Sequence, residues 1–112
     1  MKNFEQIRAR NALGVKIGSG AGGGENVAKK VPVMIVNNGI IAAAAFALET
    51  GEGYEDAFNA AIKHLADREI ALIPPAMSLK DFIFHLVNCN SNELRLITAE
   101  TMAYLNYLRR FA

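Results

Sequence analysis

The segment VNNGIIAAAAF at residues 36–46 decides between a helical and a β reading of the chain. Asn38-Gly39 is a strong short turn signal, so a hairpin that reverses here is one reading. The alanine-rich stretch at residues 42–49 has poor strand propensity, however, and a lone hairpin would be unsupported. Helix-favouring residues instead predict a helix that begins near Asn26 and reaches the end of this stretch.

A first helix is predicted before this segment. Asn3, with Gln6 three residues later, forms a capping pattern for a helix that runs to about Lys16. The stretch GSGAGGG at residues 18–24 stops it, because five glycines lose much backbone entropy on ordering. We therefore predict a glycine-rich mobile loop at residues 18–25.

The remaining sequence predicts three further helices. Apolar residues spaced i, i+3, i+4 and i+7 give one inward face to a helix at about residues 54–68. Two prolines then force an extended link at residues 73–77. The last two helices begin at capping patterns, which are Ser78 with Asp81 and Asn90 with Glu93. The chain is thus predicted to be all-α, with residues 1–112 forming one domain, a small bundle of about five helices.

Length and composition narrow the class of protein. The longest apolar run, residues 39–48, is about half of the ~20 residues that cross a bilayer. Cys89 is the single cysteine, which excludes an internal disulfide and a cysteine-rich zinc site. We therefore expect a soluble, cytoplasmic protein with no membrane partner.

Charge is divided along the chain although the net charge is only +1. Residues 1–35 carry six Lys or Arg against two Glu, and residues 36–75 carry two Lys or Arg against six Asp or Glu. Such a division is compatible with a basic face for a polyanion and an acidic face for head-to-tail association. Chance clustering of charged residues on solvent-exposed helix surfaces explains the division equally well.

Motifs for catalysis or cofactor binding are weak. Gly18, Gly20 and Gly23 match GxGxxG, but the strand and parallel sheet that a dinucleotide site needs are not predicted. His64 is expected at the surface and His85 in the core, and neither has a second ligand at metal spacing. We expect no cofactor, no metal, no catalytic residue and no enzymatic activity.

Three blocks of the sequence resemble a known family. They are IRARNAL at residues 7–13, KKVPVMIVNNGIIAAAAF at residues 29–46 and ITAETMAYLNYLRRFA at residues 97–112. In this order they resemble the small all-helical subunit of the type III-B CRISPR effector, the fifth protein of the Cmr RAMP module. The resemblance implies a non-catalytic subunit that stacks with its own copies along the guide RNA and binds target RNA in antiviral defence. It also implies the other Cmr subunits as partners.

The resemblance implies roles for particular residues. It implies a helix straight through Asn38-Gly39, at an intrinsic cost of roughly 1 kcal/mol for the glycine. Small or short side chains would then permit close packing against a neighbouring subunit, unless they only fit the core of the bundle. The candidates for this packing are Asn38, Gly39, Ala42 and Ala43. Charge makes a second set candidates for RNA phosphate contacts, namely Arg8, Arg10, Lys16, Lys29, Lys30, Arg109 and Arg110.

Two other functions stay open from the sequence. A helical assembly adaptor would bridge protein subunits with little direct nucleic-acid contact, and its association would depend little on salt. A small enzyme would need Cys89 within hydrogen-bond reach of His64 or His85.

Overall fold

Six helices, with no strand, make up the residues that the structure describes, 3–17 and 23–111 of a computed structural model. Their bounds are α1 Phe4–Ala12, α2 Gly23–Asn38, α3 Ile40–Thr50, α4 Glu52–Leu65, α5 Leu79–Asn88 and α6 Ser91–Phe111. The all-α prediction is confirmed, with one helix more than the five or so expected.

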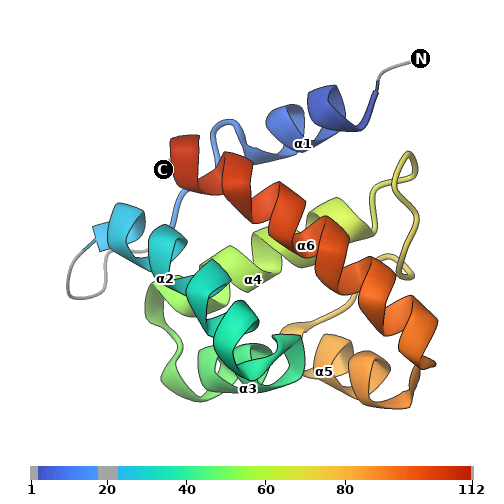
Figure 1. The fold of residues 1–112 in the computed structure, drawn as a ribbon. Helices are drawn as coiled ribbons and strands as arrows, with labels where there is room; N and C mark the ends of the chain where they lie inside the picture. Colours follow the sequence, from blue (N-terminus) through green and yellow to red (C-terminus); the bar gives the residue numbers. More distant parts are fainter. Residues whose placement is uncertain (1–2, 18–22, 112) are drawn as a thin grey trace.

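Helix α4 lies at the centre of the arrangement, because each of the other five helices packs against it. In Figure 1 the long helix α6 crosses diagonally in front of α4, and α1 lies along the top beside α6. Helices α3 and α5 pack against each other on the opposite side. The first and last helices are therefore neighbours, although most of the chain separates them in sequence.

The core is built from the inward faces that the apolar spacing predicted. All four apolar residues of the predicted stripe in α4 are buried, and α5 and α6 each bury apolar residues as well. The largest of these fully buried side chains are Phe58, Leu65, Phe82, Leu86, Ile97, Leu105 and Leu108. Burial of apolar surface of this kind is the main favourable contribution to folding.

The prediction of one helix through Asn38-Gly39 is wrong. Helix α2 ends at Asn38, Gly39 has φ +89° and ψ 158°, and α3 begins at Ile40. This conformation is almost confined to glycine, since a Cβ would meet the backbone of its own residue. The turn signal therefore prevails, but it joins two helices that pack on each other instead of two strands.

Helix ends differ from the prediction by a few residues. Helix α1 ends at Ala12 instead of Lys16, because Gly14 has φ +82° and interrupts the helical conformation. Helix α2 begins at Gly23, earlier than expected, since its buried Val27 and the residues after it anchor the first turns in the core. Most of the predicted glycine-rich loop, residues 18–22, lies outside the described residues.

The predicted capping patterns are confirmed. Asn3 and Gln6 cap α1 reciprocally, and Ser78 and Asp81 do the same for α5. Before α6, the Asn90 side chain accepts a hydrogen bond from the backbone N–H of Glu93 at 2.8 Å. These contacts satisfy N–H groups that a helix start leaves without an intrahelical acceptor.

Candidate functional site

Six of the seven predicted RNA-contacting cations are exposed, and five of these six lie toward one end of the molecule. These five residues, named here the basic corner, are Lys16, Lys29, Lys30, Arg109 and Arg110. Two of them lie in α2 and two in the last turn of α6, and these helices pack against each other. Figure 1 shows the C-terminal end of α6 beside the first half of α2, with the segment after α1 running toward the same place.

Arg8 and Arg10 lie apart from the basic corner, and both are hydrogen-bonded to carboxylates of the chain. Arg8 forms two hydrogen bonds to the Glu100 carboxylate, at 2.8 and 2.7 Å. Arg10 pairs with Asp67 at 2.7 Å and with Glu69 at 2.9 Å. A phosphate at either arginine would compete with these carboxylates, so the structure separates Arg8 and Arg10 from the basic corner.

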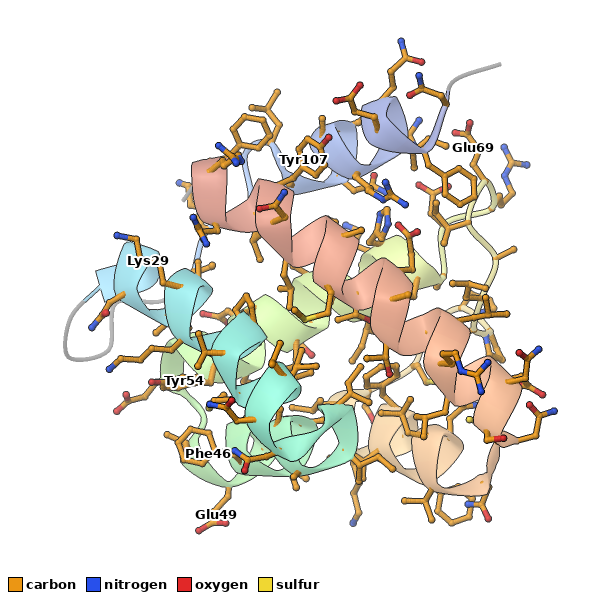
Figure 2. All side chains as sticks on the ribbon, viewed as in Figure 1. Lys29, Phe46, Glu49, Tyr54, Glu69 and Tyr107 are labelled. Carbon is orange, nitrogen blue, oxygen red and sulfur yellow. The ribbon has the colours of Figure 1, made fainter. Side chains whose placement is uncertain are left out.

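An acidic and apolar surface lies at the other end of the arm that α2 and α3 form. Glu49 and Glu52 are exposed around the junction of α3 and α4, and Phe46 and Leu48 are 43% and 42% exposed beside them in sequence. Figure 2 shows Phe46 and Glu49 at the lower end of this arm and Lys29 near its upper end. Part of the division of charge in the sequence is therefore also a division in space, although Asp67 and Glu69 of the acidic stretch pair with Arg10 on α1.

The predicted subunit-packing residues are divided between surface and core. Asn38, Gly39 and Ala42 are exposed at the elbow between α2 and α3, whereas Ala43 is buried. A Cβ built on Gly39 would have no neighbour within 4 Å. Within this chain the glycine therefore serves the backbone conformation of the elbow and not a close approach between helices.

A buried polar cluster joins α1, α4 and α6, and the sequence did not reveal it. His64 was expected at the surface but is 1% exposed, which corrects that prediction. Its Nε2 lies 2.8 Å from Glu100 Oε2, and its Nδ1 lies 2.9 Å from Asn11 Nδ2. Its ring stacks on Tyr104, whose hydroxyl donates to the backbone carbonyl of Asn11. The polar partners that allow His64 to be buried lie on α1 and α6. The spacing of residues within α4 gives no information about them.

The partners of His64 determine its protonation. The Glu100 carboxylate only accepts hydrogen bonds, so Nε2 donates; the Asn11 amide nitrogen only donates, so Nδ1 accepts. The ring is therefore neutral, in agreement with burial, which lowers the pKa of His64 despite the opposing effect of Glu100. Burial acts to raise the pKa of Glu100, but hydrogen bonds from Arg8 and His64 outweigh it and lower that pKa.

His85 and Cys89 line a hollow of about 490 Å³ between α5 and the start of α6. Among the described residues, His85 Nε2 is buried without a hydrogen-bond partner, and Cys89 Sγ donates to the carbonyl of Leu86 at 3.5 Å. The two side chains are thus not hydrogen-bonded to each other. Within the described residues no group of three His, Cys, Asp or Glu side chains is arranged to hold a metal ion.

The described helices include none that combines the length and the apolar character needed to cross a bilayer. What the geometry offers is a set of exposed cations, a separate acidic end and exposed apolar side chains on helices. These features are typical of helical proteins that bind other molecules at their surfaces.

Comparison with known families agrees with this class. Residues 5–112 match the model of the CRISPR-associated protein family Cas_Cmr5. The chain belongs to this family and is a subunit of a CRISPR Cmr complex, with other Cmr subunits as its partners. No curated protein and no solved structure matches it.

Proposed function

We propose that this chain is a non-catalytic subunit that stacks with its own copies along the guide RNA of the Cmr complex and binds target RNA for antiviral defence in the cytoplasm. The observation that carries the proposal is the basic corner, where exposed cations from three segments lie toward one end of the molecule. Exposed Lys and Arg side chains attract phosphates with little dependence on sequence, as a subunit that follows an RNA backbone requires.

Stacking is supported by two surfaces of complementary character. Val33 and Val36 are 57% and 73% exposed on α2, near the lysines of the basic corner. Phe46 and Leu48 are exposed near Glu49 at the other end of the arm. A basic and apolar surface on one copy can therefore meet an acidic and apolar surface on the next.

The proposed absence of catalysis is supported by the environment of the reactive side chains. Both ring nitrogens of His64 are engaged by Glu100 and Asn11, and Cys89 Sγ donates to a backbone carbonyl. We expect Cys89→Ser to leave every activity of the assembled complex unchanged. A loss of RNA cleavage in that variant would contradict this part of the proposal.

Charge reversal in the assembled complex tests RNA binding. The test variant changes Lys16, Lys30, Arg109 and Arg110 to Glu, and a matched control changes Lys63, Arg68, Lys80 and Arg95, which are also exposed. The measurements are target-RNA affinity at several salt concentrations, guide-RNA content and copies of the subunit per complex. We expect weaker target binding and a salt slope smaller by about 3 in the test variant alone, with four contacts to single-stranded RNA lost. Equal slopes in both variants, at normal copy number, would refute the RNA contact.

An assembly adaptor without RNA contact is the second candidate, favoured by the exposed valines of α2 and by the engagement of Arg8 and Arg10 within the chain. For this function, Val36→Lys would reduce the number of copies per complex, because a charge would enter an apolar contact. The charge reversals of the basic corner would then leave the salt slope unchanged. The number of copies per complex and the salt slope of RNA binding therefore distinguish the assembly adaptor from the RNA-binding subunit.

A further inference from the structure

We propose that α1 is a releasable element whose attachment to α4 and α6 is controlled by protonation of His64. The residues that make this attachment, named here the α1 latch, are Arg8, Asn11, His64 and Glu100. The inference concerns a conformational device of the chain and is independent of RNA binding.

Helix α1 has a small apolar contribution to its attachment. Of its nine residues only Ile7 and Ala12 are buried, whereas α4 buries seven of fourteen. An isolated helix of this length is not stable in water, so release of α1 also means its unfolding. Because little apolar surface would be exposed, this local opening requires less free energy than unfolding of the whole chain.

Polar contacts supply much of the remaining attachment. The Arg8–Glu100 pair is largely removed from solvent, with side-chain exposures of 23% and 7%. The Tyr104 hydroxyl donates to the Asn11 carbonyl at 2.8 Å, and Tyr107 donates to Glu5 at 3.0 Å. Figure 2 shows Tyr107 pointing from α6 toward α1. The interface between α1 and α6 thus includes four polar side-chain contacts, two from Arg8 to Glu100, one from Tyr104 to Asn11 and one from Tyr107 to Glu5.

The geometry of the latch accepts only a neutral imidazole. Asn11 Nδ2 has two hydrogens, one directed to His64 Nδ1 and the other to Asp67 Oδ2, at 2.9 and 3.0 Å. A proton on Nδ1 would therefore face an N–H group. Turning the amide over would direct its oxygen at the Asp67 carboxylate, which only accepts. No rotation of Asn11 satisfies both neighbours once His64 is protonated.

The charges around His64 come from three parts of the chain. Glu100 on α6 and Asp67 after α4 favour the imidazolium, and Arg8 on α1 opposes it. Arg10 on α1 is paired with Asp67, and the neutral phenol of Tyr104 on α6 stacks on the ring. In the described part of the chain, α2, α3 and α5 also pack on α4, but the charges that act on the ring are these.

The sign of the effect follows from linkage. Release of α1 exposes His64 to water and removes Arg8, while Glu100 stays beside the ring on α6. The pKa of His64 is therefore higher in the released state than in the attached state, where burial lowers it. Attachment is therefore fully favourable above the pKa of His64 in the released state and is weakened as the pH falls below it. If the attached state takes up no proton and the released state titrates at the ordinary value of 6.5, the ratio of released to attached α1 rises roughly tenfold between pH 7.5 and 5.5.

Hydrogen exchange on the full-length protein tests the latch. The amides of α1 should lose protection roughly tenfold over this pH interval, after correction for the intrinsic exchange rate, while those of α4 and α6 keep theirs. His64→Gln is the informative variant, because its amide can donate to Glu100 and accept from Asn11 without titrating. It should abolish the pH dependence, whereas the exposed Arg95→Gln control should retain it. An unchanged pH dependence in His64→Gln, or equal loss of protection in all three helices, would overturn the proposal.

A second measurement needs no variant in the core. The chain has only two histidines, so the imidazole signals of His64 and His85 can be followed by nuclear magnetic resonance. We expect His64 to titrate below 6.5 and α1 amides to broaden by exchange over the same pH range. A pKa for His64 at or above 6.5 with α1 attached would overturn the proposal regardless of how His64→Gln folds.

Discussion

Replacing Gly39 by alanine tests the elbow between α2 and α3 through the sign of the change in stability. Gly39 has φ +89° and ψ 158°, a region of backbone space that is almost confined to glycine. A non-glycine residue held there costs on the order of 1–3 kcal/mol. The new methyl group meets no atom within 4 Å, so this backbone strain is the whole effect. We expect Gly39→Ala to lower the free energy of unfolding by that amount.

The opposite result would support a continuous helix. Inside a helix, replacement of glycine by alanine raises stability by about 1 kcal/mol. Urea denaturation followed by circular dichroism gives the free energy, and thermal unfolding should show a fall of roughly 4 °C per kcal/mol for a chain of this length. Ala42→Gly, at an exposed position inside α3, is the control and should cost about 1 kcal/mol. A Gly39→Ala protein as stable as the parent, or more so, would refute the elbow.

Three further substitutions test individual contacts by the free energy of unfolding in urea. Tyr104→Phe keeps the buried ring but removes the hydroxyl that donates to the Asn11 carbonyl, so it should cost about 1 kcal/mol; no loss would contradict this role. Pro32→Ala should raise the free energy of unfolding, because proline inside α2 removes a backbone hydrogen bond, and a fall would contradict this. Ser78→Ala should cost about 1 kcal/mol through loss of the cap of α5, while Ser78→Thr should restore most of it.

The parts of the fold that depend on local spacing could be predicted from the sequence. Capping patterns correctly marked the starts of α1, α5 and α6, since each needs only residues three apart. The inward face of α4 was also found, because helical spacing reports which side of a helix is apolar. The elbow at Gly39 was missed because helix propensity on both sides says nothing about one residue with positive φ.

Only part of the candidate site could be predicted from the sequence. Charge alone proposed seven cations, and it could not distinguish the basic corner from Arg8 and Arg10, whose acidic partners are 57 to 92 residues away in sequence. His64 and Glu100 are 36 residues apart and were not connected for the same reason. One feature of the sequence does indicate a buried polar contact. Glu100 belongs to the otherwise apolar inward face of α6, next to buried Thr101. An acidic residue on such a face requires a cationic or hydrogen-bonding partner.

The pairing of α1 with α6 also constrains the order in which the protein can form during translation. The side chains that receive α1, Glu100, Tyr104 and Tyr107, are synthesised long after it, with Arg8 and Glu100 separated by 92 positions. A nascent chain from which these residues have not yet emerged therefore carries the segment of α1 without a docking surface. Docking of this segment must wait until residues 100–107 are available, and until then it is open to chaperones and proteases.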